Sequence, residues 1–104
     1  MVFLTGKRKK NPETSIQSAI KEYLQWKGFF VYRNQANIGS HKGIADLTAL
    51  RADMPALFIE VKSAKGELSA YQRQFGDEVV NHGHCYVVAR SVQDVIGHLI
   101  KVGL

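Results

Sequence analysis

The chain alternates between stretches with apolar residues at helical spacing and shorter, nearly continuous apolar runs. Isoleucine or leucine recurs every four positions between Asn11-Pro12, which is typical of a helix start, and Gly28, which predicts a first helix. Four apolar runs predict strands at residues 29–33, 44–51, 56–62 and 84–89. The short link between the second and third strands predicts that these two form an antiparallel hairpin.

Two further helices are predicted after the hairpin. Ser69 and Gln72 form a capping-box pattern for a helix that is expected to end at Gly83. Ser91 is expected to cap a last helix, whose inner face carries Val92, Val95, Ile96 and Leu99. The predicted order is therefore α-β-β-β-α-β-α, which indicates an α/β fold with a mixed sheet flanked by helices.

Three charged residues interrupt the apolar runs of the predicted hairpin. Asp46 lies in its first strand, and Glu60 and Lys62 lie near the end of its second strand. Charges in such runs are costly to bury unless they are paired or bind a metal. Alternation along a strand places Glu60 and Lys62 on one face and Val61 on the other. Two carboxylates and an ammonium group at one edge of a sheet can hold a divalent cation beside a phosphate. Two alternatives without such chemistry remain. Asp46 could be a strand-end residue paired with a nearby cation, and Glu60 and Lys62 could form a cross-strand salt bridge on a solvated face.

Two polar residues outside the hairpin are candidates for the same site. Glu13 lies in the first helical turn, where the helix dipole favours an acid, but it points to the middle of the apolar stripe of that helix. A carboxylate in that position needs a partner. Gln72 either serves the capping box alone or also reaches the site.

The order and spacing of these residues resemble the signature of the PD-(D/E)xK nuclease superfamily, and in particular its small stand-alone VRR-type nuclease domains of viruses and bacteria. The resemblance covers roughly residues 12–95 and rests on Glu13, Gly43, Asp46, Glu60-Val61-Lys62 and the run Leu68-Ser69 to Gln72. One departure is Ala45, which stands where the name-giving motif has a proline that shapes the backbone. The resemblance implies a restriction-endonuclease-like fold.

The resemblance also implies a role for each residue in metal-dependent phosphodiester hydrolysis. The ligands implied for Mg²⁺ or Mn²⁺ are Asp46, Glu60, the backbone carbonyl of Val61 and, through water or at a second ion, Glu13. Lys62 would position the attacking water and stabilise charge in the transition state. Gln72 would orient Lys62 or that water. Cleavage would leave a 5′-phosphate and a 3′-hydroxyl.

Charge adds a preference for a polyanionic partner. The 104 residues include 14 Lys and Arg and 9 Asp and Glu, which gives a formal net charge of +5. Residues 1–11 are expected to form a basic flexible arm, and residues 12–104 a single nuclease domain. The side chains expected to contact DNA are Lys7, Arg8, Lys9, Lys10, Arg33, Ser40, His41 and Lys42.

Together these observations predict an endodeoxyribonuclease that uses Mg²⁺ or Mn²⁺ and no small-molecule cofactor. The resemblance implies branched DNA, such as four-way junctions, as the substrate. It also implies a homodimer, because symmetric cutting needs two sites and each chain supplies one. Apolar residues expected to pack on a partner subunit are Phe3, Leu4, Val102 and Leu104. A nuclease for flaps, ends or duplex DNA, or a noncatalytic basic DNA-binding module, remains an alternative.

Cysteine content and hydropathy bear on where the protein acts. Cys85 is the single cysteine, so an internal disulfide is impossible and a reducing compartment is suitable. No apolar run approaches the roughly 18 residues that would predict a membrane span. We therefore expect no membrane partner and a cytoplasmic location, in a bacterial cell or a phage-infected host.

Overall fold

The computed structural model describes residues 11–37 and 39–104, so the predicted arm, apart from Asn11, lies outside the described residues. The elements are α1 (Pro12–Trp26), β1 (Phe30–Arg33), β2 (Leu47–Leu50), β3 (Leu57–Val61), α2 (Ala70–Asn81), β4 (Cys85–Ala89) and α3 (Val92–Lys101). Their order confirms the predicted α-β-β-β-α-β-α arrangement. None of the described helices is long and apolar enough to cross a membrane.

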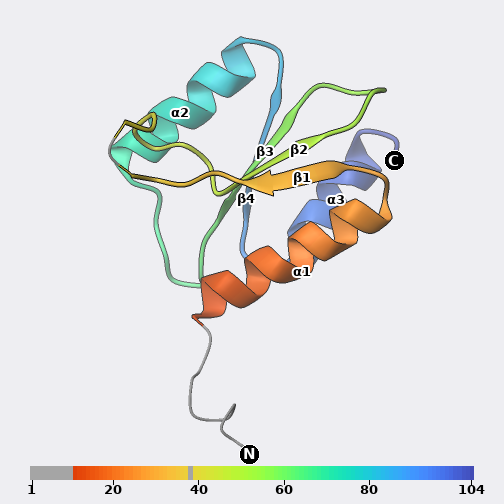
Figure 1. Cartoon of the computed structure of the whole chain (residues 1–104), viewed down its shortest axis with the longest axis horizontal. Helices are drawn as coiled ribbons and strands as arrows, with labels where there is room; N and C mark the ends of the chain where they lie inside the picture. Colours follow the sequence, from red (N-terminus) through yellow and green to blue (C-terminus); the bar gives the residue numbers. More distant parts are fainter. Residues whose placement is uncertain (1–10, 38) are drawn as a thin grey trace, which may run out of the picture.

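The four strands form one mixed sheet in the order β1-β2-β3-β4 (Figure 1). The predicted hairpin is confirmed, because β2 and β3 pair antiparallel with Leu47 opposite Ile59. β1 adds to β2 in the antiparallel sense, whereas β4 adds to β3 in the parallel sense. A parallel pair cannot be joined by a tight turn, so the chain crosses over through α2 between β3 and β4.

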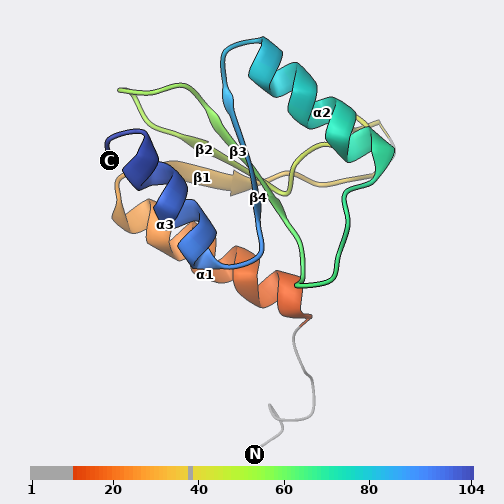
Figure 2. The same ribbon diagram turned by 180° about the vertical axis from the view of Figure 1, so that it is seen from behind.

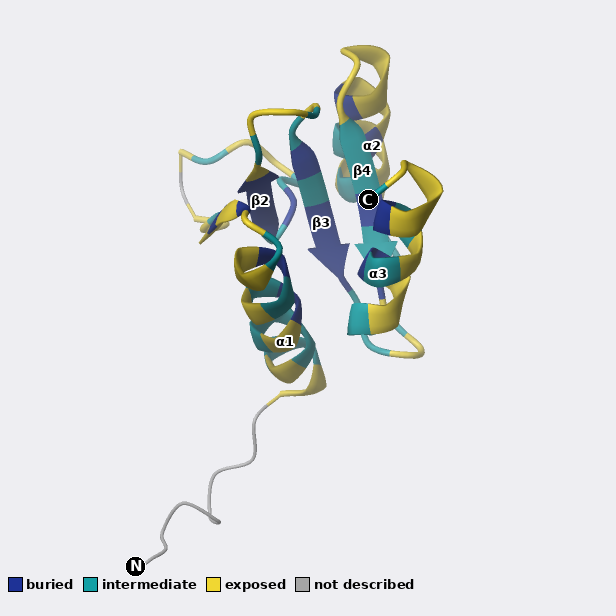
Figure 3. Ribbon diagram, turned by 90° about the vertical axis from the view of Figure 1, so that its right-hand side faces the viewer, coloured by how far each residue is buried: buried dark blue, intermediate teal, exposed yellow. Residues whose placement is uncertain are grey.

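Helices cover both faces of the sheet. In Figures 1 and 2, α1 and α3 lie on one side of the sheet and α2 lies on the other. The alternation of β3 explains the two faces: Leu57, Ile59 and Val61 join the main hydrophobic core with residues of α1 and α3. Phe58 points the other way and contacts Phe75 of α2, with the ring centroids 5.7 Å apart. The buried strands β2 and β3 lie at the centre of the molecule (Figure 3).

The predicted helix starts of α1 and α2 are confirmed in atomic detail. The Asn11 side chain accepts a hydrogen bond from the backbone N–H of Glu13 at 2.8 Å, and Pro12 is the first helical residue. In α2, the Ser69 side chain accepts from the N–H of Gln72 at 3.1 Å. The Gln72 side chain accepts from the N–H of Ser69 at 2.8 Å, which completes the capping box.

The prediction for the last helix is confirmed in position only, because Ser91 is its N-cap residue but lacks the expected side-chain bond. Instead, Asp94 in the first turn reaches back, and its carboxylate accepts a hydrogen bond from the backbone N–H of Arg90 at 2.8 Å. An acidic group at this end also interacts favourably with the helix dipole. The helix therefore begins where predicted, with Ser91 in the N-cap position and the Asp94 carboxylate bound to the residue that precedes it.

The second strand begins later than predicted, at Leu47 rather than residue 44. The chain turns just before it: the N–H of Ile44 donates to the carbonyl of His41 at 3.2 Å, and Gly43 has a φ of 75°. Asp46 therefore precedes β2, although its carbonyl still accepts from the N–H of Asn34 at 2.9 Å. At the end of the ladder, the Asp46 side chain can turn towards β3.

Candidate active site

Asp46 and Glu60 meet across the β2–β3 pair. Leu47 lies opposite Ile59, so extending the register by one residue places Asp46 opposite Glu60 on the face that α2 covers. The Asp46 carboxylate also accepts a hydrogen bond from the backbone N–H of Val61 at 2.7 Å. This bond fixes the first carboxylate beside the second. The carbonyl of Val61, a predicted metal ligand, belongs to the same strand end.

Glu60 is buried to an unusual degree for an acid, with 3% of its surface exposed. Its Oε2 accepts a hydrogen bond from the Gln72 side chain at 3.1 Å. Its Oε1 has no hydrogen-bond partner among the described residues. Burial, and then the charge of Asp46, raise the pKa of Glu60 from 4.5 to about 8. A buried carboxylate oxygen without a hydrogen-bond partner among the described residues, next to a second carboxylate, suits a hard divalent cation.

Lys62 follows β3 directly and faces the same way as Glu60. Its Nζ lies 3.9 Å from Oε2 of Glu60, and its side chain is 15% exposed. The backbone N–H of Lys62 donates to the carbonyl of Ala89 at 3.0 Å, which continues the β3–β4 ladder by one residue. The ladder therefore holds the ammonium group beside the carboxylate pair. Lys62 also lowers the pKa of Glu60, but burial and Asp46 outweigh this effect.

Gln72 has both of the functions that the sequence left open. Its side-chain oxygen serves the capping box of α2, while its amide nitrogen donates to Glu60. The structure thus places Gln72 at the carboxylate pair, where it contacts Glu60. Tyr86 of β4 supports this turn of α2, because its hydroxyl donates to the carbonyl of Gln72 at 3.4 Å.

A close backbone approach sets the position of α2 above the site. Gly43 lies against the first turn of this helix, and a Cβ atom at residue 43 would collide with the backbone of Tyr71. Only glycine combines this contact with a φ of 75° at low cost. The turn at residues 41–44 and the start of α2 are therefore held together, which brings Asp46 and Gln72 towards each other.

Glu13 reaches the site from α1. Its carboxylate accepts a hydrogen bond from the backbone N–H of Ser63, fifty residues away in the chain, at 3.2 Å. Glu13 is close enough for its charge to raise the pKa of Glu60 further. In residues 11–37 and 39–104, no three His, Cys, Asp or Glu side chains form a group that could hold a metal by themselves. A cation here would rely on Asp46, Glu60, backbone and water.

Two residues near the site were missed by the sequence reasoning. Arg90 follows β4, and its guanidinium donates to the carbonyls of Ser63 at 2.6 Å and Gly66 at 2.7 Å, which clamps the loop after Lys62. Asn34 donates to the carbonyl of Ala45 at 3.0 Å, beside Asp46. Neither residue interrupts an apolar run or belongs to a recognisable motif, so the sequence carries no signal for these contacts.

The predicted DNA-contacting residues are only partly brought together. Ser40, His41 and Lys42 line a pocket of about 580 Å³ that also contains Asp46 and Gln72. Arg33 is exposed at the end of β1, outside this pocket. The remaining basic residues, Lys7, Arg8, Lys9 and Lys10, lie outside the described residues.

Comparisons with known proteins identify the family and the fold of this chain. The family model of the VRR-NUC domain matches residues 6–93. A solved structure described as "VRR_NUC domain" has a TM-score of 0.74 and 21% sequence identity, covering 91% of this chain and 100% of that chain. Another, "VRR_NUC domain protein", has a TM-score of 0.70 and 19% identity, covering 90% and 89%. No curated protein matches the chain.

At these sequence identities the structural matches show a shared fold, whereas the family match also shows to which protein family the chain belongs. It spans most of the chain and includes the segments that carry Glu13, Asp46, Glu60, Lys62 and Gln72. The fold is the restriction-endonuclease-like arrangement that the resemblance implied. The chain belongs to the VRR-NUC domain family, and this membership implies a nuclease-type function.

Proposed function

We propose that this protein is a divalent-metal-dependent endodeoxyribonuclease that cuts branched DNA such as four-way junctions. Residues 12–104 would form its nuclease domain, and residues 1–11 a basic arm. The observation that carries the proposal is Glu60, whose carboxylate is 3% exposed and has one oxygen without a partner among the described residues. A buried acid with only a structural role is normally fully hydrogen-bonded. A catalytic or metal-binding role therefore explains the grouping of Glu60 with Asp46 and Lys62 better than a structural role does.

Asp46 and Glu60 would hold Mg²⁺ or Mn²⁺, together with the carbonyl of Val61 and water. A bound cation of this kind stabilises negative charge on phosphoryl oxygens and lowers the pKa of coordinated water. Two carboxylates suffice, because Mg²⁺ in nucleases and related enzymes keeps several waters and also contacts substrate phosphate. Glu13 would contribute through water, since its carboxylate already accepts the N–H of Ser63.

The remaining side chains have roles that follow from their positions. Lys62 would position the attacking water and stabilise the charge that develops on the phosphate, because its ammonium group adjoins Glu60. Gln72 would keep the Glu60 carboxylate in place through its amide. Arg90 and Glu13 would hold the backbone that follows Lys62, through the carbonyl and the N–H of Ser63 respectively.

Homodimerisation would supply the second site that symmetric cutting requires. Exposed apolar side chains at the end of the chain support this part of the proposal: Ile100 is 69% exposed and Val102 is 48% exposed. Leu104 instead packs partly against the core of its own subunit. The apolar residues predicted at the other end, Phe3 and Leu4, lie outside the described residues.

A cleavage assay with matched substrates tests the proposal. Labelled four-way junction, flap, linear duplex and single strand are incubated with Mg²⁺, Mn²⁺ or EDTA. We expect junction cleavage with either metal, none in EDTA, and none for Asp46→Asn or Glu60→Gln, while both variants still bind DNA. Glu22→Gln, an exposed acid on α1, is the matched control and should cut normally.

The outcomes separate the parts of the proposal. Activity in EDTA, or full activity of either site variant, would refute the metal mechanism. Equal cleavage of duplex and junction by a monomer, as judged by sedimentation, would refute junction selectivity and leave metal-dependent cleavage standing.

A further inference from the structure

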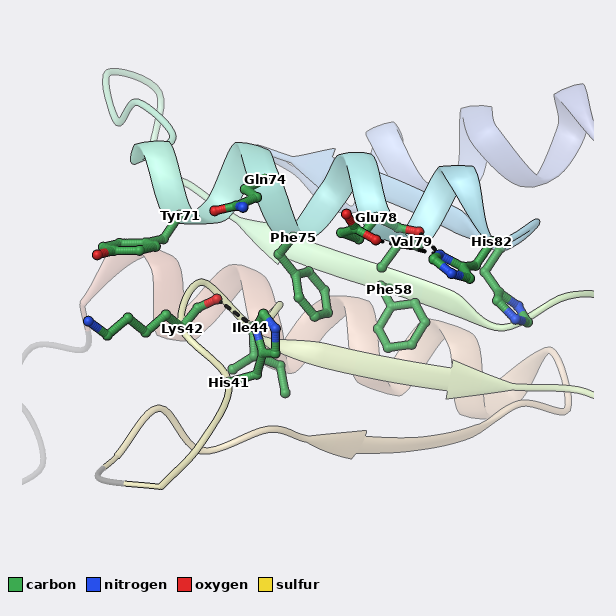
Figure 4. A pocket seen from close by; sticks show the side chains of 11 residues that line it. His41, Lys42, Ile44, Phe58, Tyr71, Gln74, Phe75, Glu78, Val79 and His82 are labelled. Carbon is green, nitrogen blue, oxygen red and sulfur yellow. Dashed lines mark hydrogen bonds and ion pairs between the residues drawn. The ribbon is translucent and has the colours of Figure 1, made fainter.

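A second groove runs along α2 (Figure 4). It has a volume of about 710 Å³ and lies between one face of this helix and the turn and strands below it. It shares His41, Lys42, Ile44 and Tyr71 with the pocket that contains Asp46 and Gln72. The two hollows therefore adjoin each other, and Asp46 lines the smaller one.

The floor of this groove is aromatic and apolar. Phe75 points from α2 towards Phe58 of β3, and their rings meet edge to face (Figure 4). The His41 ring adjoins the same Phe75 ring, with the centroids 5.8 Å apart. Ile44 and Val79 complete the apolar lining. Such a surface suits a flat, weakly polar group, and a nucleobase has this character on each of its faces.

The end nearest the carboxylates carries a cation over an aromatic ring. The Lys42 ammonium lies 4.9 Å from the centroid of the Tyr71 ring. Tyr71 lines the groove and is 52% exposed, whereas Phe58 and Phe75 are half-buried, so its ring is the aromatic surface on which a base in the groove can stack. A cation between the aromatic groove and Asp46 is placed to hold a phosphate that joins a base in the groove to the DNA at the active site.

The rim of the groove is polar and could meet the edges of a base. Gln74, Glu78, His82 and His84 line it, in contrast to the apolar floor. A nucleotide fits such a rim better than an apolar segment of a protein partner would, because a nucleotide carries hydrogen-bond donors and acceptors around a flat centre. The position of the groove beside the pocket that Asp46 lines also favours the substrate itself over a separate partner.

We propose that this groove receives an unpaired base of the DNA substrate, next to the phosphate that is cut. The inference rests on the proposed nuclease function and narrows it: the preferred substrate has a nucleotide released from base pairing at the branch. A fully paired duplex keeps its bases stacked and cannot fill the groove without the cost of unstacking one of them.

Two DNA duplexes that differ in one nucleotide test this inference. Both have the same sequence, and one carries a single unpaired 2-aminopurine, whose fluorescence falls when it stacks on an aromatic ring. Binding is measured in EDTA, so that no cleavage occurs. We expect quenching on binding of the bulged DNA. Tyr71→Ala should restore the fluorescence and weaken binding of this DNA roughly tenfold, the effect of losing one base–aromatic stack.

Two variants control for structure and for ring chemistry. Tyr71→Phe keeps the ring and should bind bulged DNA like the parent. Trp26→Ala removes an aromatic side chain that is 80% exposed on α1, outside the groove, and should also bind normally. The affinity of every variant for the plain duplex should stay unchanged, and thermal unfolding confirms that each variant is folded.

Several results would overturn the inference. Equal losses of affinity for both duplexes would make Tyr71 a general contact, and persistent quenching in Tyr71→Ala would place the base elsewhere. A changed oligomeric state in Tyr71→Ala would assign the groove to a protein segment. Each of these results leaves the proposed nuclease function intact, whereas a parent protein that binds and cuts neither DNA would refute both.

Discussion

Glu60 is buried beside another carboxylate, so its ionisation should make the stability of the folded chain depend on pH. Its pKa is raised from 4.5 to about 8 in the folded protein. Between these values the folded chain keeps a proton that the unfolded chain has released. Without metal, the free energy of unfolding should therefore fall as pH rises, by up to about 1.4 kcal/mol per pH unit.

Urea denaturation in EDTA across about pH 5 to 8 measures this effect. Glu60→Gln mimics the protonated acid and should flatten the dependence, so that its advantage over the parent grows with pH. Glu22→Gln, an exposed matched control, should follow the parent curve. Parallel curves for all three proteins would show that Glu60 does not hold its proton in the folded state.

Lys62 belongs to the same site, but its contribution should be kinetic. Lys62→Ala is expected to lower the single-turnover cleavage rate about 100-fold or more, because charge stabilisation of this kind acts mainly in the transition state. DNA affinity should change much less. Lys65→Ala, an exposed lysine three residues further on, should have a normal rate. A weaker affinity with an unchanged rate of bound substrate would reduce Lys62 to a phosphate contact.

At the scale of elements, the contact between the turn at residues 41–44 and the start of α2 is the arrangement most open to test. Gly43→Ala adds a methyl group that meets the backbone of Tyr71 and strains a φ of 75°. We expect a loss of about 2 kcal/mol or more in unfolding free energy and slower cleavage, as α2 carries Gln72 away from Glu60.

Gly39 supplies a matched control for this substitution. It also has a positive φ, 94°, but a Cβ there would meet nothing within 4 Å. Gly39→Ala should therefore show the backbone strain without the collision. Equal losses of stability in the two variants, measured by urea denaturation, would mean that the contact with α2 contributes nothing.

At the scale of the whole molecule, the net charge should affect the affinity for DNA more than it affects the rate of cleavage. Deleting residues 1–10 removes Lys7, Arg8, Lys9 and Lys10 from a chain with a formal net charge of +5. If these side chains contact phosphates, affinity should fall and the plot of log affinity against log salt should become shallower, by about 0.9 for each lost contact. The cleavage rate at saturating protein should persist. A slope equal to that of the parent would assign the arm to solvent.

The element order and the identity of the site candidates could be read from the sequence, because both depend on local patterns. Helical and strand periodicities, and caps such as Asn11 and Ser69, involve residues within four positions of one another. Asp46, Glu60 and Lys62 were conspicuous because charges in apolar runs need partners. Ser91 shows the limit of such reasoning, since it occupies the N-cap position without the expected side-chain bond, and the hydrogen bond at this helix start is instead made by Asp94 to the N–H of Arg90.

Contacts between distant segments were decided by the tertiary structure. The sequence does not indicate that Glu13 meets Ser63, or that Arg90 clamps the loop after Lys62, because each contact depends on how helices and strands pack in three dimensions. The turn at Gly43 displaced the predicted start of β2, and in doing so placed Asp46 at the strand end. The chain thus encodes its elements and its chemically notable residues locally. Packing sets the distances between those residues, because side-chain shape and strand register act only once the chain is folded.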